Sequence, residues 1–306
     1  EEAALKGMLA VHKLKPIQYW LNHTEPDMSY AHNSYPCKII GSTVSISVLM
    51  AQKMPVYKVN AEKIARNAAQ FLIDQSRPEG DPLAFFPPTY YGDNAAAKLP
   101  ENKGKMMTMD AVTAGTAFLD LYTLTKDQQY MDRALGIADT YARIQNTDGS
   151  YPIKVDFYTG KPLNDSKAML QPLLNYFRRL HESFGIKKYD QAHAKAEAWM
   201  QNVALRNFDF TGQFEDVAVV NLRPYENLTN CTAAPYASYL LKKQAPTAEE
   251  IAYAKDLIRL SEDQFLYWDT FANKLGAASG VQSAWLVCAC ITLYKTPLYI
   301  TLLPTA

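Results

Sequence analysis

The chain has 306 residues, a length that suits two domains of about 150 residues each or one larger closed fold. Its composition, 48% hydrophobic and 20% charged, is that of a globular protein and excludes a disordered or collagen-like chain. The 31 basic and 31 acidic side chains cancel, so no net field attracts nucleic acid or an anionic membrane, and we expect no nucleic-acid partner. The longest apolar stretches, such as Ala284–Leu293, fall short of the roughly 20 residues that cross a bilayer, so we expect no membrane span.

Apolar residues recur at helical spacing along most of the chain. Ile64, Ala68 and Phe71 fall on one helical face, and later segments repeat this pattern. Pro172 implies that the helix around it starts late or kinks. Only residues 216–221 offer a short ribbon, so the sequence predicts an all-α protein. The predicted helices span residues 3–20, 38–53, 60–75, 108–124, 128–146, 165–184, 189–205, 229–243, 247–266 and 277–295.

The cysteines and histidines do not form the motifs of a metal centre. The cysteines lack CxxC spacing and are predicted to be small buried hydrophobic residues. The five histidines show neither HxH nor HExxH spacing, and GxSxG, P-loop and GxGxxG motifs are also missing from the sequence. We therefore expect no cofactor and no transition metal, with calcium bound by loop carboxylates left open. The four cysteines are Cys37, Cys231, Cys288 and Cys290.

The predicted helices come in pairs, and the second helices of four pairs end alike, with a glutamine shortly before a loop. The intervals between these glutamines are 70, 56 and 63 residues, which indicates an internal repeat. A repeat of roughly 60 residues is too long for tetratricopeptide or HEAT units. We predict that these glutamines lie at the same end of a ring of antiparallel hairpins: Gln75, Gln145, Gln201 and Gln264.

Three consecutive segments carry a family resemblance. Residues 109–122, 125–134 and 144–152 have the pattern of a helix, a tight turn, a second helix and an Asp-Gly loop. This arrangement resembles the (α/α)6 toroid of the six-hairpin glycosidase group, which includes unsaturated glucuronyl and rhamnogalacturonyl hydrolases, N-acylglucosamine epimerases and related polysaccharide lyases. The resemblance implies a toroid in which inner and outer helices alternate. Ten predicted helices instead of twelve imply that one hairpin is missing, disguised or truncated.

The same resemblance implies a single α/α toroid domain over residues 1–306 and a carbohydrate-active enzyme. Its partner would be an oligosaccharide or polysaccharide, an acidic one being an option, and a glycoside hydrolase is the favoured activity. Residues 223–229 and 261–269 also resemble stretches in secreted proteins of polysaccharide-degrading bacteria. A periplasmic or secreted location is therefore expected ahead of a cytoplasmic one.

Glycoside hydrolysis needs two carboxyl groups, one protonated and one ionised, roughly 5 to 9.5 Å apart. Asp110 begins an inner helix, at the position where the resembled uronide hydrolases have a catalytic aspartate, although a helix cap would explain it as well. Glu226 precedes the next predicted inner helix and is the second candidate. Asp165 is the third, with capping as the stronger explanation.

Aromatic residues in the loops are candidates for sugar binding. The chain has 20 tyrosines, and partly exposed rings stack on the C–H face of a pyranose. Tyr90 and Tyr91 lie in a loop without helical periodicity, so they form a stacking platform or plug the core. Arg223 is a candidate for a bidentate contact to an acidic sugar. Further candidate contacts follow the Asp148-Gly149 turn or end the segment that contains Gln264. They are Tyr151, Lys154, Asp156, Tyr158, Trp268 and Asp269.

Two other functions stay open at this level. A polysaccharide lyase needs a basic residue near a cation that neutralises a uronate, and Tyr151 with Lys154 is a candidate pair. A non-catalytic glycan-binding protein on the same fold would have the aromatic platform and lack a close carboxylate pair. The sugar, its linkage and the stereochemistry of the reaction do not follow from the sequence.

Overall fold

The computed structural model describes residues 2–204 and 230–259. Several predictions lie outside these residues, including the helix 277–295, the ribbon 216–221 and the end of the helix 247–266. The chain forms two compact units, residues 1–168 with 176–193, and residues 169–175 with 194–306. The single domain over the whole chain stays a prediction. The candidate residues outside the described ranges are Arg223, Glu226, Gln264, Trp268, Asp269, Cys288 and Cys290.

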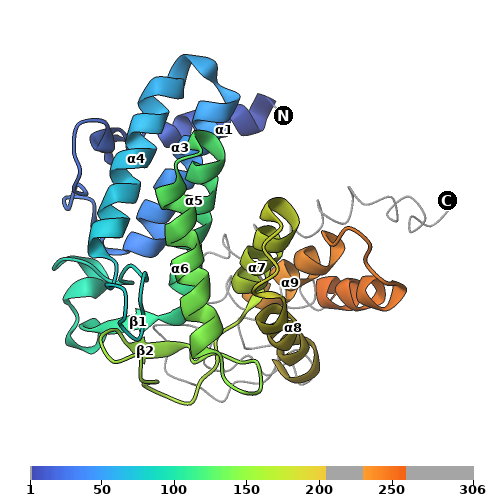
Figure 1. Ribbon diagram of the computed structural model, residues 1–306. Coiled ribbons are helices and arrows are strands. Elements are labelled where there is room, and N and C mark those ends of the chain that lie inside the picture. Colours follow the sequence, from blue (N-terminus) through green and yellow to red (C-terminus); the bar gives the residue numbers. More distant parts are fainter. Residues whose placement is uncertain (1, 205–229, 260–306) are drawn as a thin grey trace, which may run out of the picture. The chain divides into compact units, whose positions relative to one another are not determined.

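Two helical hairpins form the centre of the first unit. Helices α3 (Gly41–Lys53) and α4 (Lys58–Gln75) make one hairpin, and α5 (Ala111–Thr125) and α6 (Gln128–Ile144) make the next. Helix α3 packs against both α4 and α5, so the first helices of the two hairpins are neighbours (Figure 1). All four helices agree with the predicted ranges to within a few residues. The periodicity therefore predicted the hairpins correctly.

The amino-acid pattern separates inner from outer helices. Helix α5 is apolar nearly all round and buries residues on most of its faces, which suits a helix enclosed by others. Helices α4 and α6 bury one face and expose polar residues on the other. Small residues let the inner helices approach: a Cβ at Gly41 would lie 3.2 Å from Thr113 Cγ2 of α5. The alternation of inner and outer helices follows from these patterns.

The tight turn between α5 and α6 is fixed by local hydrogen bonds. Lys126 adopts a left-handed conformation with φ +60° and ends α5. Asp127 then caps α6 by accepting a hydrogen bond of 3.3 Å from the Gln129 amide, while its own amide donates to Thr125 Oγ1. Arg66 of α4 lies 3.4 Å from the same carboxylate and ties the turn to the neighbouring hairpin.

The long connections after α4 and α6 meet in a two-stranded antiparallel ribbon. Strand β1 (Lys105–Met107) pairs with β2 (Lys154–Asp156), with Lys105 opposite Asp156. Three-residue strands are too short for an alternating pattern, so the sequence did not predict them. Helices α4 and α6 both run toward this ribbon in Figure 1, which places Gln75 and Gln145 at the same end, as predicted.

The first helical segment of the chain is broken. One helix was predicted over 3–20, but α1 (Glu2–His12) ends and a short α2 (Lys15–Gln18) begins after two intervening residues. Pro16 explains the break, because it has no amide hydrogen and lies in the first turn of α2. No helix in the described part of the chain is both long and apolar enough to cross a membrane.

Helix α7 (Gln171–Phe184) starts late, as Pro172 in its first turn predicted. It is followed by α8 (Asp190–Trp199). Within the first unit, Phe177 stacks on Tyr189 with ring centroids 5.6 Å apart. A π-helix (Met200–Ala204) continues α8 and contains Gln201.

The second unit contains α9 (Asn230–Leu241) and a helix over residues 248–259. Thr247 and Glu250 form a reciprocal capping box at the start of the latter, with distances of 2.8 and 3.1 Å. Lys243 lies between two carboxylates, 2.5 Å from Glu197 and 2.6 Å from Glu250. These contacts join the described helices of the second unit.

Candidate functional site

Asp110 is buried at the start of the inner helix α5. It ends a single 3-10 turn (Thr108–Asp110), and only 4% of its surface is exposed. Its side chain makes no capping hydrogen bond to α5, so the capping explanation of Asp110 is wrong. Instead, Oδ1 lies 3.4 Å from the Nζ of Lys38. An ammonium at this distance from a buried carboxylate favours its ionised form.

Among the described residues, two buried neutral side chains, Cys37 and Tyr141, lie near Asp110. Burial raises the pKa of the Cys37 thiol well above its ordinary value, and the charge of Asp110 adds to the effect. Burial likewise raises the pKa of Tyr141, with Cys37 and Asp110 as smaller causes. Lys38 is 44% exposed in its side chain and therefore connects the buried carboxylate with solvent. Lys38 is thus a cationic neighbour of this buried acidic group and lies at the surface.

The turn that carries Asp110 is held by Tyr141 of α6. The Tyr141 hydroxyl donates a buried hydrogen bond of 2.6 Å to the Thr108 carbonyl. We expect Tyr141→Phe to lower the free energy of unfolding by about 1–3 kcal/mol, because the buried carbonyl loses its donor. Urea denaturation followed by circular dichroism measures this loss.

Tyr130→Phe is the matched control for Tyr141→Phe. Tyr130 is also a buried tyrosine of α6, but its hydroxyl has only a 3.5 Å contact with Arg66. Arg66 can still lie against the ring of a phenylalanine, so this variant should lose less stability. Equal losses in the two variants would contradict the role given to the Tyr141 hydroxyl.

The loop 87–91 runs beside the segment that supplies Lys38. The Tyr91 amide donates to the Ser34 carbonyl at 2.9 Å, and the Cys37 thiol donates to the Pro87 carbonyl at 3.3 Å. Between these contacts, the rings of Tyr35 and Tyr90 meet with centroids 5.9 Å apart. The aromatic loop and the Asp110–Lys38 pair therefore belong to neighbouring segments.

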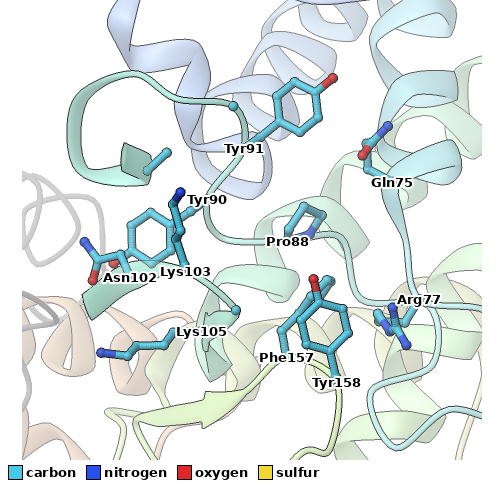
Figure 2. Close-up of a pocket in the computed structure, with 13 residues that line it drawn as sticks. Gln75, Arg77, Pro88, Tyr90, Tyr91, Asn102, Lys103, Lys105, Phe157 and Tyr158 are labelled. Carbon is cyan, nitrogen blue, oxygen red and sulfur yellow. The ribbon is translucent and has the colours of Figure 1, made fainter. Parts of the chain in front are cut away.

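A pocket of about 470 Å³ opens in the first unit between this loop, the start of β1 and the turn after β2 (Figure 2). Three predicted sugar-binding residues, Tyr90, Tyr91 and Tyr158, line it. Their position in one pocket agrees with the prediction of an aromatic platform, and their role in binding stays a prediction. The other lining residues are Gln75, Arg77, Pro88, Gly92, Ala97, Asn102, Lys103, Gly104, Lys105 and Phe157.

The remaining predicted contacts lie in different surroundings. Tyr151 has no exposed surface, and burial raises its pKa, which is opposite to what a catalytic base requires. Lys154 and Asp156 belong to β2, and Asp156 accepts hydrogen bonds from the amides of Tyr158 and Thr159. Tyr151 is thus closed to substrate, and the hydrogen bonds to Asp156 give it a structural role.

Asp165, the third carboxylate candidate, lies exposed in the connection that leads to α7. The turn there is formed by its neighbours, since the Ser166 amide donates to Asn164 Oδ1 at 3.1 Å. Its exposure contrasts with the burial of Asp110. A catalytic role of Asp165 beside Asp110 stays a prediction.

Sequence reasoning missed Lys38 and the cations of the pocket, Arg77, Lys103 and Lys105. Lys38 stands in an apolar segment without a motif, and it acquires meaning only through its contact with Asp110. The two lysines in Lys103-Gly-Lys105 were a usable signal, because they place two cations close together in the connection that follows Tyr90 and Tyr91. Within the described ranges, no group of three or more His, Cys, Asp or Glu side chains is placed to hold a metal ion.

Comparison with solved structures identifies the fold. The mostly helical chain has the (α/α)6 toroid fold of the six-hairpin glycosidases, as the sequence predicted. It is similar to a solved structure of the unsaturated glucuronyl hydrolase UGL, a variant described together with dGlcA-Glc-Rha-Glc. The TM-score is 0.55 at 17% sequence identity, and the match covers 86% of this chain and 69% of that one. At this identity the likeness shows the fold alone.

Comparisons of sequence give no closer identification. No protein-family model matches the chain, and no curated protein matches it. The function must therefore be argued from the site and from the shared fold.

Proposed function

We propose that this protein is a carbohydrate-active enzyme, a glycoside hydrolase that cleaves an oligosaccharide with paired carboxyl groups. The observation that carries the proposal is Asp110, a buried carboxylate at the start of an inner helix that does not cap this helix and is paired with Lys38. A buried charge costs free energy, so its retention where no capping role explains it supports a chemical role. The fold shared with UGL supports the same reaction class.

The Lys38 contact suggests which of the two carboxyl roles Asp110 takes. Lys38 favours the ionised form of Asp110, and an ionised carboxylate acts as the base that activates water or as the nucleophile. The second carboxyl group then donates a proton to the oxygen of the leaving sugar. Water supplies the hydroxyl to the anomeric carbon, and the glycosidic C–O bond breaks. Glu226 and Asp165 are the candidates for this acid.

The lyase alternative has less support. It requires a base that removes a proton from a uronate, and the candidate Tyr151 is buried with a raised pKa. No described feature of Tyr151 brings its hydroxyl to solvent. Hydrolysis through Asp110 is therefore the reaction that we propose.

The products of the reaction test this proposal. We expect incubation with a panel of acidic and neutral oligosaccharides to release one new reducing end for each bond cleaved. Hydrolysis adds water, so the ultraviolet absorbance of a new unsaturated uronide should not rise. Reducing-end analysis, mass spectrometry and absorbance together measure these outcomes. Products that gain no water and absorb in the ultraviolet would identify a lyase. If no oligosaccharide of the panel is cleaved, the proposal of an enzyme is wrong.

A further inference from the structure

The described residues that line the pocket beside loop 87–91 do not include the carboxyl groups that hydrolysis needs. Among the described residues, none of the side chains that line it is acidic, and Asp110 is not part of the lining. The described lining therefore offers no pair of carboxyl groups for hydrolysis. A concave site of about 470 Å³ is nevertheless large enough to hold a sugar unit. Its chemistry is that of binding.

The pocket carries positive charge. Arg77, Lys103 and Lys105 line it, and neither lysine forms an ion pair within residues 2–204 and 230–259. Arg77 is paired with Asp81, whose negative charge offsets that of the guanidinium. The charges of the two lysines are not offset in this way by a described residue. Cations gathered in a concave site raise the local concentration of anions. The ligand that suits this pocket is anionic.

Aromatic rings line the same pocket. Tyr158 is 58% exposed, and the Arg77 guanidinium lies 5.0 Å from the centroid of its ring. Phe157 stands against Tyr158 with ring centroids 5.6 Å apart. Figure 2 shows this pair on one side of the pocket and Tyr90 with Lys103 on the other. An exposed ring close to cations suits a ligand that has an apolar face and an anionic substituent, as acidic pyranoses do.

The backbone around the pocket is held in place before any ligand arrives. The Phe157 amide donates to the Gly104 carbonyl at 2.8 Å, and this hydrogen bond connects two of the segments that line the pocket. Asp156 accepts hydrogen bonds from the amides of Tyr158 and Thr159, at 3.1 and 2.7 Å, and fixes the turn that presents Tyr158. A preformed site loses less conformational entropy on binding.

We propose that this pocket is a non-catalytic binding subsite for a sugar unit bearing a carboxylate or a sulfate. The identity of the ligand as a sugar rests on the proposed function, whereas its negative charge rests on the pocket itself. The subsite holds an acidic unit of the glycan while the bond that is cleaved lies elsewhere, at Asp110.

Isothermal titration of the full chain tests the proposal. The probes are a glucuronate-containing tetrasaccharide, a sulfated tetrasaccharide and a neutral tetrasaccharide. We expect at least one acidic probe to bind, with an affinity that falls as salt rises, and the neutral probe to bind at least about tenfold more weakly. The acidic probe that binds more tightly shows whether the anionic group is a carboxylate or a sulfate.

Variants then assign the binding to this pocket. The double variant Lys103→Met with Lys105→Met should weaken binding of the acidic probe about tenfold or more, and Tyr158→Ala should weaken binding of the same probe. Lys63→Met is the matched control, because Lys63 is exposed on α4 and does not line the pocket. It should bind as the parent does. Circular dichroism confirms that each variant is folded.

The outcomes separate this proposal from the proposed function. Asp110→Asn should still bind the acidic probe although it no longer cleaves, because Asp110 does not line the pocket. If the parent chain binds the acidic probe but cleaves no glycan, the hydrolase proposal is wrong and the subsite proposal stands. Unchanged binding in the double lysine variant, equal affinity for the neutral probe, or binding of neither acidic probe would overturn the subsite itself.

Discussion

Replacing Asp110 with asparagine should reduce kcat by about 10²- to 10⁴-fold, the usual contribution of general acid–base catalysis, and leave the fold intact. Asparagine has nearly the same shape, so the 3-10 turn and the start of α5 are preserved. It carries no charge and cannot accept a proton from water. Lys38, which loses its acidic neighbour, is 44% exposed in its side chain and remains solvated. Stability should therefore change little while turnover is lost.

Kinetics on a substrate that the parent cleaves measure this effect. We expect kcat and kcat/KM to fall together, as they do when an interaction made only in the transition state is removed. Glu226→Gln and Asp165→Asn identify the partner, since the variant of the proton donor should lose turnover as severely. Asp132→Asn, an exposed change on α6, is the control and should stay active. Full activity of Asp110→Asn would show that the assignment of Asp110 is wrong.

Gly115→Ala should lower the free energy of unfolding, although alanine usually stabilises a helix. A Cβ at Gly115 would lie 2.6 Å from the hydroxyl oxygen and 2.7 Å from Cζ of Tyr176. Tyr176 is buried, and its hydroxyl donates to the Ala134 carbonyl at 2.7 Å, so its ring has little room to move. Overpacking costs about 1–3 kcal/mol, and the gain in helix propensity is at most about 1 kcal/mol, so we expect a net loss of about 1 kcal/mol.

Gly7→Ala is the matched control for Gly115→Ala. Gly7 is exposed within α1, and a Cβ there meets no atom within 4 Å. Only helix propensity acts at this position, so the variant should be more stable by about 0.5–1 kcal/mol. Urea denaturation of both variants gives the comparison. Opposite signs are expected, and a stabilised Gly115→Ala would show that Tyr176 moves aside freely.

The helices and their pairing could be predicted because their signals are local. The spacing of Ile64, Ala68 and Phe71 defines the buried face of α4, and the segment from Thr125 to Ala134 encodes both the turn and the start of α6. Pro172 marked the start of α7 in the same way. Pro16 gave an equal signal for the break between α1 and α2, but the predicted helix 3–20 ran through it. The repeat of these hairpins then led to the toroid fold.

The candidate site was predicted only in part. The aromatic loop stood out because Tyr90 and Tyr91 have no helical periodicity, and the structure places both in the pocket. Tyr151 has the same kind of loop sequence, yet it is buried, since composition does not show which ring of a loop packs inward. The three-residue strands β1 and β2 were too short to be recognised.

The sequence by itself determined which segments are helices, how they pair and which residue types stand at their ends, because these properties depend on neighbours a few residues away. It also brought out Asp110, but it could not separate a cap from a buried functional group. Tertiary structure decided that question by placing Lys38 beside Asp110 and leaving α5 without a side-chain cap. Lys103 and Tyr158 likewise meet in one pocket only because β1 pairs with β2. Contacts between distant segments set the burial and charge of each group, and these set its chemistry.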